Sequence, residues 1–372
     1  MQQKKIDYLF LGPSKPFRGG IAETQKYLAE EISLKGFNVE VWTFTKLYPK
    51  VLFPGKSQFD KNKIEKNKLK SKRIVHAYNF FNWKSVAKKI NFLRPKIVVF
   101  RYWTPLISPC WCYINRNLDK SIKTVGLIDN WEHHEPKIWD KKLNSYFGNS
   151  MDLIVTFSEA VANQIKKTIK RKVLIGFHPI PNEKKFGGPS HVNSYINESN
   201  CVLFFGLIRK YKGLQTLIES MKYNHNFKLL IVGEFYDDKK KYLKLIEKLK
   251  LQGRIDIVDK YVANDEIRNF FLKSKAVILP YKTASQSGVI SLAYLFEKPI
   301  VVSNLEGLTS YVKDDNSGVV FNNTSMDLAN AINIVLNKKN NFRFSKNIGE
   351  NKKKYSWNKF ADEVVKFTFN NN

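Results

Sequence analysis

Residues 280–304, PYKTASQSGVISLAYLFEKPIVVSN, contain a pattern that binds phosphate in many proteins. An apolar strand ends at the start of this stretch, and a turn of serine and glycine leads into a helix. Ser287, Gly288 and Val289 stand at the helix N-terminus, where unpaired backbone N–H groups and the helix dipole attract an anion. Ser285 or Ser287 also suits the N-cap position, and a cap is compatible with phosphate binding.

Two cations follow the end of another expected strand, in FFGLIRKYKGLQTLIE (residues 204–219). Arg209 offers a planar fork for two phosphate oxygens, and Lys212 acts as a mobile point charge. Together they can neutralise a diphosphate and ease its departure as a leaving group. A solvent-facing basic turn in a basic protein explains the same two residues equally well.

A glycine-containing loop, GPSKPFRGGIAE (residues 12–23), follows the first expected strand and opens a helix. Gly19 and Gly20 stand directly before the helix, where they let a ligand approach the backbone. The loop lacks the G-x-G-x-x-G spacing and the lysine-serine pair of a P-loop, so neither of those sites is indicated. A plain tight turn is the alternative.

Polar residues gather where a further expected strand ends, in LIDNWEHHEPKIWD (residues 127–140). Adjacent histidines cannot both face one ion from a regular element, and no Cys or His pair at zinc spacing completes a metal site. We predict a polar site for sugar hydroxyls with one histidine near the reacting centre, against the alternative of a surface histidine pair. The residues concerned are Asp129, Asn130, Glu132, His133, His134 and Glu135.

Short apolar runs alternate with amphipathic stretches along the whole chain, which is typical of α/β proteins with parallel sheets. Prolines and glycines interrupt this rhythm around residues 173–190, which we interpret as an interdomain linker. We therefore predict two doubly wound, Rossmann-like domains, at residues 1–180 and 181–354. Ligands of such sheets bind beyond the carboxyl ends of the strands, and the expected site is the cleft between the domains.

The composition of the 372 residues, with 43% hydrophobic and 14% aromatic residues, supports packed cores. No apolar run approaches the length of a membrane-spanning helix, and the opening MQQKKIDYLFLG is better interpreted as a first strand than as a signal peptide. The three cysteines, Cys110, Cys112 and Cys201, fit buried thiols in a reducing cytoplasm.

The formal net charge of +30 would attract nucleic acid, anionic lipid or phosphorylated small molecules. Lysine codons favoured by an AT-rich genome explain part of it. The densest basic segment, residues 56–73, lacks the interleaved aromatic residues of a single-strand binder. A solvated loop, a contact with an anionic membrane, and nucleic-acid binding are its three interpretations.

The four motifs resemble, in this order, the GT-B glycosyltransferases of family 4 (glycosyl transferases group 1), retaining enzymes of bacterial envelope polysaccharide synthesis. The likeness is most specific in FFGLIRKYKGLQTLIESM, KLLIVGEF, AVILPYKTASQSGVISLAYLFEKPIVVSNLEGL and DDNSGVVF. It implies two Rossmann-like domains facing a central cleft, with the donor nucleotide-sugar on the C-terminal domain and the acceptor on the N-terminal one. The tail YSWNKFADEVVKF resembles the family's final helix, expected at residues 355–369, which crosses back to the N-terminal domain.

The resemblance also implies roles for single residues, and it implies transfer with retention at the anomeric carbon without a metal or other cofactor. His134, Arg209 and Lys212 would be the catalytic residues, with His134 beside the donor sugar and the two cations on the diphosphate. Asp129, Asn130 and Glu135 would lie on the sugar or acceptor side. The donor-binding set would be Gly19, Gly20, Arg209, Lys212, Glu234, Ser287, Gly288 and Val289, with Glu234 on the nucleoside side.

One departure from the family concerns its E-x7-E pattern, whose first Glu touches the sugar and whose second touches the ribose. Aligned on the shared Lys-Pro, Ala284 stands near the first position and Leu292 at the second, so both carboxylates are missing. The backbone phosphate contact survives this loss, but a buried hydroxyl without a partner costs roughly 1–3 kcal/mol. Either another residue takes over or the donor differs from the usual one.

We therefore expect an enzyme that moves a sugar from a nucleotide-diphospho-sugar to a glycan or lipid-linked acceptor in bacterial surface polysaccharide or lipopolysaccharide synthesis. We expect a cytoplasmic protein, with peripheral contact to the anionic inner face of the plasma membrane as an additional feature. A catalytically silent sugar-nucleotide-binding or scaffold protein of the same pathway is the alternative. An RNA-binding protein is a second alternative that only the charge suggests, and we expect no nucleic acid as a partner.

Overall fold

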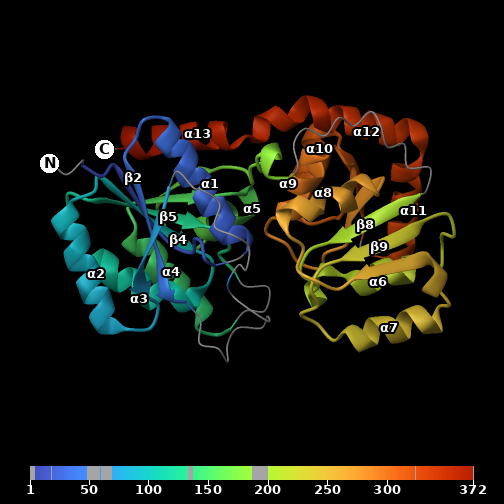
Figure 1. The fold of residues 1–372 in the computed structure, drawn as a ribbon, viewed down its shortest axis with the longest axis horizontal. Helices are drawn as coiled ribbons and strands as arrows, with labels where there is room; N and C mark the ends of the chain where they lie inside the picture. Colours follow the sequence, from blue (N-terminus) through green and yellow to red (C-terminus); the bar gives the residue numbers. More distant parts are fainter. Residues whose placement is uncertain are drawn as a thin grey trace. The chain divides into compact units, whose positions relative to one another are not determined.

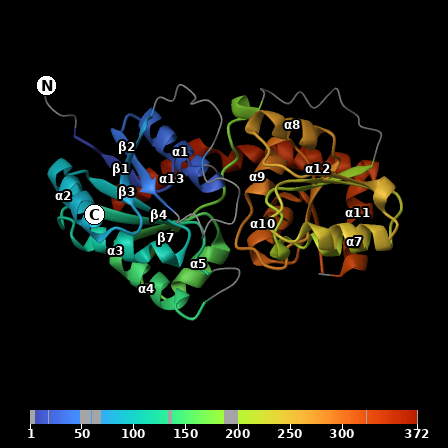
Figure 2. The same cartoon turned by 60° about the horizontal axis from the view of Figure 1, so that its bottom comes forward.

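The structure is a computed structural model of the 372-residue chain, and it describes residues 5–17, 19–47, 59, 69–132, 137–186, 200–322 and 324–371. The chain forms two compact units. Unit 1 comprises Met1–Phe177 with Trp357–Asn372, and unit 2 comprises His178–Ser356. The sequence prediction places the change of domain at residues 180–181 and the start of the returning helix at residue 355. Figures 1 and 2 show both units as ribbons.

Unit 1 contains, in its described part, a seven-stranded parallel sheet in the order β3-β2-β1-β4-β5-β6-β7. Its inner strands are buried, mostly apolar runs such as YLFL and IVVFRY, as expected where helices cover both faces of a sheet. The strands are β1 (Tyr8–Leu11), β2 (Val39–Lys46), β3 (Ser71–His76), β4 (Ile97–Tyr102), β5 (Lys123–Ile128), β6 (Leu153–Thr156) and β7 (Lys172–Ile175).

Strand β7 lies where the sequence predicts the beginning of a linker, so this part of the prediction is wrong. The four residues KVLI of β7 pair in parallel with β6, between Leu153–Lys172 and Thr156–Ile175. Both end residues of β7 are exposed, because it forms the edge of the sheet. Such a short edge strand, followed at once by glycine and proline, leaves only a weak pattern in the sequence.

The described helices of unit 1 cover its sheet, and α3 and α4 lie side by side (Figure 2). They are α1 (Gly20–Leu34), α2 (Phe80–Leu93), α3 (Ser108–Arg116), α4 (Asp140–Ser150), α5 (Glu159–Lys166) and α13 (Trp357–Asn370), with a short 3-10 turn, η2 (Pro105–Ile107).

Helix α13 is the predicted helix that returns to the N-terminal unit, and it packs beside α1 (Figure 1). The Phe360 ring lies 5.1 Å from that of Phe157, and Trp357 lies 5.6 Å from Tyr27, measured between ring centroids. The hydroxyl groups of Tyr8 and Thr368 are 2.6 Å apart inside the core. The final helix is therefore an integral part of unit 1.

Unit 2 contains, in its described part, a six-stranded parallel sheet in the order β10-β9-β8-β11-β12-β13. The strand order reverses between β8 and β11, and in doubly wound sheets ligands bind beyond the carboxyl ends of the strands at this point. The strands are β8 (Cys201–Phe205), β9 (Lys228–Val232), β10 (Ile255–Val258), β11 (Ala276–Leu279), β12 (Ile300–Ser303) and β13 (Gly318–Phe321).

Helices cover both faces of the sheet of unit 2, with α6, α7 and α11 in one apolar cluster and α8, α9 and α10 in the other (Figure 1). The helices are α6 (Leu214–Ser220), α7 (Lys239–Lys248), α8 (Asn264–Leu272), α9 (Gly288–Leu295), α10 (Glu306–Asp315), α11 (Ser325–Leu336) and α12 (Lys338–Asn351). Short 3-10 turns are η3 (Glu183–Phe186), η5 (Lys210–Lys212), η6 (Gln252–Arg254) and η7 (Lys352–Tyr355). The predicted α/β architecture of two doubly wound domains is confirmed.

Two of the three cysteines are buried, as predicted, whereas Cys201 is half-buried at the start of β8. Burial raises the pKa of Cys112 to about 11, so its thiol stays protonated near neutral pH. Among the helices that the structure describes, none combines the length and apolar character needed to cross a bilayer.

Candidate functional site

Two loops meet at the carboxyl ends of β8 and β11, where the strand order of unit 2 reverses. Gly213, after η5, has φ +71°, and a Cβ on it would stand 1.7 Å from the carbonyl oxygen of Pro280. The N–H of Lys282 also donates to the carbonyl of Tyr211 at 2.7 Å. Glycine at 213 thus allows the two backbones to touch, and this contact holds η5 beside the loop that leads into α9.

Lys212, the last residue of η5, is a buried cation with only 8% of its surface exposed. Its Nζ lies 5.5 Å from the ring centroid of Tyr281, and among the described residues it forms no ion pair. Burial lowers the pKa of Lys212, Tyr211 opposes this effect, and the nearby Arg209 lowers the pKa further. A buried ammonium group without a counter-ion is costly, so it marks a place where an anion would be bound.

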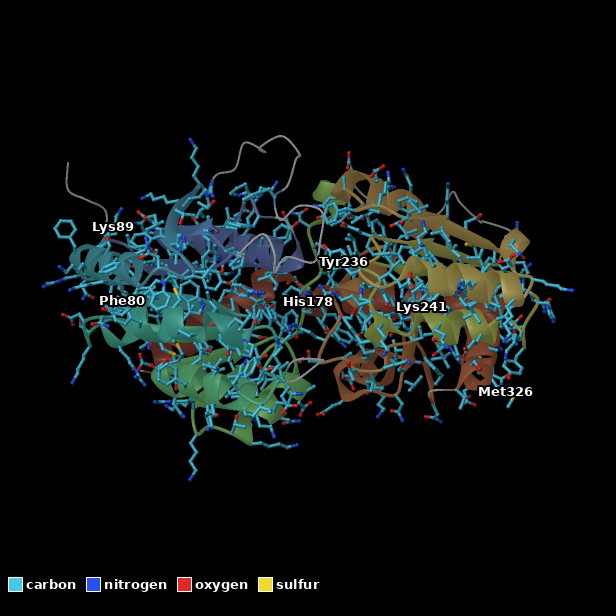
Figure 3. All side chains as sticks on the ribbon, turned by 90° about the horizontal axis from the view of Figure 1, so that it is seen from below. Phe80, Lys89, His178, Tyr236, Lys241 and Met326 are labelled. Atoms are coloured by element: carbon cyan, nitrogen blue, oxygen red, sulfur yellow. The ribbon has the colours of Figure 1, made fainter. Side chains whose placement is uncertain are left out.

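Arg209 precedes the same turn and is exposed. Its Cζ lies 5.1 Å from the ring centroid of Tyr236, labelled in Figure 3, and among the described residues Arg209 forms no ion pair. The guanidinium is therefore stacked on an aromatic face without being committed to a carboxylate. The alternative of a solvent-facing basic turn fits Arg209, but it does not fit the buried Lys212.

The N-terminus of α9 lies next to Lys212. Ser287 is the N-cap, because its Oγ accepts a hydrogen bond from the N–H of Val289 at 3.3 Å. The hydroxyl of Tyr281 is 3.4 Å from the same Oγ, so one tyrosine contacts the cation through its ring and the cap through its hydroxyl. Sequence reasoning missed Tyr281, which has no motif of its own.

Gly288 opens α9 and is exposed, whereas Val289 is buried. The N–H groups of Val289 and Ile290 both donate to Ser287, at 3.3 Å to Oγ and 3.1 Å to the carbonyl oxygen. No acceptor contacts the N–H of Gly288 among the residues that the structure describes. This N–H is the amide of the first turn best placed to receive a phosphate oxygen.

A pocket of about 310 Å³ adjoins the same loop and is lined by Thr216, Pro280, Tyr281, Lys282 and Phe321. Glu234, predicted on the nucleoside side, follows β9 and is buried. Its carbonyl accepts from the N–H of Ile208 at 2.9 Å, so the chain after β9 lies beside the chain that carries Arg209.

A histidine and a serine that sequence reasoning missed lie at the same helix. The Oγ of Ser291, in α9, is 2.9 Å from the carbonyl oxygen of His178 and 3.0 Å from its Nδ1. A Cβ on Gly288 would meet Nε2 and Cε1 of His178 at 3.4 Å, so the ring edge lies at the start of α9. His178, labelled in Figure 3, is the first residue of unit 2, inside the segment interpreted as a linker.

The two positions that lack carboxylates also lie in this part of unit 2. Ala284 stands in the loop before α9 and Leu292 in the helix itself, and both side chains are half-buried against one apolar cluster of unit 2. Leu292 thus has a packing role where the resemblance predicts a glutamate.

The structure describes some of the predicted residues of unit 1 and not others. Gly19 is the N-cap of α1 with φ +110°, and apart from adjacent residues and the backbone of α1 itself, no described atom lies within 4 Å of a Cβ built on Gly19 or Gly20. Asn130 is half-buried after β5. His134 and Glu135, with His133, lie outside the described residues, so their roles stay predictions.

Asp129 is held inside unit 1 with 6% of its surface exposed. Its two oxygens accept from Nε and Nη2 of Arg101 at 2.6 and 2.5 Å, and Nη2 also donates to Thr24 at 2.8 Å. Burial raises the pKa of Asp129, and Arg101 offsets part of that rise. This ion pair gives Asp129 a structural function, and its predicted contact with a sugar stays a prediction.

No group of three or more His, Cys, Asp or Glu side chains is placed to hold a metal ion in the part of the chain that the structure describes. The positive charge at the start of α9 comes from the ammonium of Lys212 and from the helix N-terminus itself, and Arg209 stands immediately before η5. This arrangement can bind a phosphate or a diphosphate and stabilise it when it carries additional charge.

Comparison with known proteins shows which family and which folds the chain resembles. Residues 191–355 match the family described as Glycosyl transferases group 1. The uncharacterized glycosyltransferase MJ1607 of Methanocaldococcus jannaschii is 27% identical over 180 residues, which cover 45% of this chain and 44% of that protein. The match thus spans less than half the length of this curated relative.

Solved structures resemble the chain over nearly its whole length. Sucrose-phosphate synthase of Thermosynechococcus elongatus superposes with a TM-score of 0.77 at 15% identity, over 97% of this chain and 98% of that chain. HepE of Anabaena, solved in complex with UDP-glucose, has a TM-score of 0.70 at 14% identity, over 96% and 99% of the two chains. The predicted GT-B fold and the resemblance to the group 1 glycosyl transferases are confirmed.

Proposed function

We propose that this chain, a GT-B protein whose residues 191–355 match the group 1 glycosyl transferases, transfers a sugar from a nucleotide-diphospho-sugar to a hydroxyl of a glycan or lipid-linked acceptor. One observation carries the proposal most directly. The buried ammonium of Lys212 has no ion pair among the described residues and lies beside the N-terminus of α9. A diphosphate supplies the missing negative charge.

The proposed mechanism stabilises a leaving group. The bond between the anomeric carbon and the diphosphate oxygen breaks while the bond to the acceptor oxygen forms, and the acceptor proton passes to the departing phosphate oxygen. Lys212, Arg209 and the N–H of Gly288 neutralise the charge that develops on the diphosphate. Because these groups are fixed before the reaction, they stabilise the transition state more than a mobile solvent would.

Three finer features belong to the same proposal. The acceptor attacks the face that the diphosphate leaves, so the configuration at the anomeric carbon is retained. The cations and the helix dipole supply the positive charge, so the proposal includes no metal or other cofactor. Similarity to glycosyltransferases of lipopolysaccharide synthesis, among them the outer core galactosyltransferase WaaB, supports a function in bacterial surface polysaccharide synthesis.

The proposal is tested first by donor binding. UDP-, GDP-, ADP- and TDP-sugars are added to the purified protein, and a donor that binds the folded state raises its melting temperature. HepE was solved with UDP-glucose, so UDP-glucose is the first donor to test. Transfer to a glycan or lipid acceptor is then measured for the wild type and for the double variant Arg209→Ala, Lys212→Ala.

The double variant is expected to lose turnover, whereas a charge-matched double variant at two exposed lysines of α7, Lys244→Ala, Lys248→Ala, is expected to keep it. Near-normal transfer by the double variant would contradict the assigned roles.

A catalytically silent sugar-nucleotide-binding or scaffold protein is the second candidate, and the absence of carboxylates at Ala284 and Leu292 favours it. Both candidates bind the donor. They differ in turnover: binding of a nucleotide-sugar without hydrolysis or transfer, with every acceptor tested, would favour the scaffold.

Helix α2 of unit 1 supports a peripheral contact with an anionic membrane surface. Phe81 and Phe92 lie on one face of this helix with 82% and 80% of their surfaces exposed. Lys84 and Lys88 are exposed on the same side, and the sequence of α2 contains no acidic residue. Figure 3 labels Phe80 and Lys89 of this helix. Aromatic rings beside lysines are typical of helices that lie in the lipid headgroup region.

Sedimentation with vesicles tests this contact. Vesicles of phosphatidylglycerol and phosphatidylcholine are expected to bind the protein, and vesicles of phosphatidylcholine alone are expected to bind it weakly. The double variant Phe81→Ser, Phe92→Ser should lose most of the binding while its melting temperature stays unchanged, because both rings are exposed. If the variant bound the vesicles as well as the wild type, the membrane contact would lie elsewhere, for example in the basic residues 56–73. Of these, residues 56–58 and 60–68 lie outside the described residues.

A further inference from the structure

The pocket of about 310 Å³ in unit 2 has no part in the proposed mechanism. Its lining comes from α6, from the loop after β11 and from the last residue of β13, and it comprises Thr216, Pro280, Tyr281, Lys282 and Phe321. None of the three groups assigned to the diphosphate lines this pocket. In the sheet, β13 lies two strands from β11, on the side away from β8. The pocket therefore extends from the point where the strand order reverses toward the β13 edge of the sheet.

Two polar groups of the pocket have no partner among the described residues. The ammonium of Lys282 makes no ion pair or hydrogen bond there, and the hydroxyl of Thr216 makes no hydrogen bond. The main chain of Lys282 is held in place, because its N–H donates to the carbonyl of Tyr211 at 2.7 Å. Lys282 is exposed and Thr216 is half-buried, so a ligand that enters from solvent can reach both groups.

The remaining lining of the pocket is apolar. Phe321 is buried with 3% of its surface exposed, and Pro280 is buried as well. The hydroxyl of Tyr281 lies 3.4 Å from Oγ of Ser287, so its polar atom is already used at the N-cap of α9 and its ring is left for a ligand. Apolar and aromatic walls with a few polar groups that fix the orientation of the ligand are typical of small-molecule sites.

These features define the chemistry of the ligand. The ammonium of Lys282 requires an anion, and no acidic side chain is among the described residues that line the pocket. A phosphate monoester carries nearly two negative charges near neutral pH, and lysine binds phosphate as a point charge. Thr216 requires a hydrogen-bonding group and the apolar walls require a face of C–H groups, and a sugar ring carries both.

The size of the pocket limits the ligand further. Its volume is at the lower end of the range of about 300–1,000 Å³ for small-molecule sites, which suits one ring better than a whole nucleotide. We propose that the pocket binds a sugar phosphate, with the phosphate on Lys282 and a sugar hydroxyl on Thr216.

This site is separate from the proposed diphosphate site, although Tyr281 lies at both. The ring centroid of Tyr281 is 5.5 Å from Nζ of Lys212, but Lys212 itself does not line the pocket. A sugar phosphate and a nucleoside diphosphate should therefore bind at the same time. The inference goes beyond the proposed function and does not depend on it, because the binding of a sugar phosphate needs no nucleotide.

Calorimetry with the full chain tests the inference. The probes are glucose 1-phosphate, glucose 6-phosphate, mannose 6-phosphate and N-acetylglucosamine 1-phosphate, and inorganic phosphate, glucose and glucuronate serve as partial probes. The proteins are the wild type, Lys282→Met and Thr216→Val. Lys244→Met is the control, because Lys244 is an exposed lysine of α7 that does not line the pocket. At least one sugar phosphate should bind the wild type more tightly than every partial probe, since it alone uses the cation, the hydroxyl and the apolar walls together.

The two variants should each weaken the binding of that sugar phosphate. For Lys282→Met we expect a loss of about 10-fold, the lower end for a hydrogen bond to a charged group, because Lys282 is exposed to solvent. Thr216→Val keeps the size of the side chain and removes the hydroxyl, so we expect a loss of about 2- to 12-fold. Lys244→Met should bind as the wild type does. A change in the folded fraction would alter the stoxichiometry of binding and not the affinity, so it does not imitate these losses.

Several outcomes would overturn the inference. One is the absence of binding of every sugar phosphate at millimolar concentration, and another is unchanged affinity in both Lys282→Met and Thr216→Val. Inorganic phosphate, glucose or glucuronate that binds as tightly would show that the ligand is not a sugar phosphate. Competition with the tightest-binding diphosphate among UDP, GDP and ADP would assign the sugar phosphate to the donor site. If the wild type binds a sugar phosphate and none of the nucleotides, the inference stands and the proposed function fails.

Discussion

Replacing Lys212 by methionine separates two effects of its buried charge: it destabilises the ligand-free fold, and it stabilises the leaving group during the reaction. Methionine keeps a long, apolar side chain in the buried position and removes the charge. We therefore expect Lys212→Met to lower turnover and, at the same time, to raise the melting temperature of the ligand-free protein.

The expected magnitudes follow from burial and charge. Removing one preorganised group that stabilises developing negative charge costs roughly 10²–10³ in turnover. Burying a polar group without a compensating partner lowers the free energy of unfolding by about 1–3 kcal/mol in mutational data. The variant removes the charge, so its free energy of unfolding should be higher by this amount. For a domain of about 150–250 residues, each kcal/mol corresponds to roughly 2–4 °C in melting temperature.

The pH dependence of stability gives an additional check. Burial lowers the pKa of Lys212 in the folded protein below its ordinary value of 10.5. Between the lowered pKa and 10.5 the unfolded chain binds more protons than the folded one, so the wild type gains stability as the pH rises through this window. The difference in melting temperature between Lys212→Met and wild type should therefore narrow as the pH approaches 10.5.

The assays are a donor-turnover measurement and thermal unfolding of the ligand-free protein, with Lys244→Met as the matched control. Lys244 is exposed on α7, so its replacement should change neither quantity. Turnover of Lys212→Met within about threefold of wild type would refute a role of the ammonium in the reaction. A lower melting temperature of the variant would refute the conclusion that the buried charge is uncompensated in the free protein.

Three further predictions concern the rest of the molecule. Gly213→Ala should lower the melting temperature of unit 2 and displace Lys212, because its Cβ would stand 1.7 Å from the carbonyl oxygen of Pro280; denaturant unfolding and donor affinity measure the two effects. Asp129→Asn should destabilise unit 1 by roughly 3–5 kcal/mol, since it leaves the charge of Arg101 buried without its partner; a variant as stable as wild type in urea would disprove this. Turnover should persist in excess EDTA, and a complete loss that added Mg²⁺ or Mn²⁺ restores would contradict a mechanism without metal.

The strongly periodic elements of the fold could be predicted from the sequence, because apolar strands and amphipathic helices alternate over most of its length. Strand β7 was not predicted from the sequence, because it is short, forms the edge of the sheet and is followed closely by glycine and proline. Helix α13 was predicted from a resemblance of its sequence. Its place against Tyr27 and Phe157 follows from packing over more than two hundred residues of separation, which no local pattern records.

The candidate site likewise contains features that the sequence predicts and features that depend on the tertiary fold. The N-terminus of α9 could be predicted because the serine and glycine that start a helix are neighbours in the sequence, and Ser287 is indeed the N-cap. The burial of Lys212 could not be predicted from the sequence, because it depends on the contact between Gly213 and Pro280, which belong to two separate loops. His178 and Ser291 meet only through the tertiary fold, and the surrounding prolines favoured the interpretation as a linker.

The most direct test of the central claim is a crystal structure of the protein with its bound nucleotide-diphospho-sugar or nucleoside diphosphate. We predict diphosphate density within hydrogen-bonding distance of Nζ of Lys212 and of the N–H of Gly288. A well-defined diphosphate bound elsewhere, with Lys212 and the first turn of α9 untouched, would contradict the account.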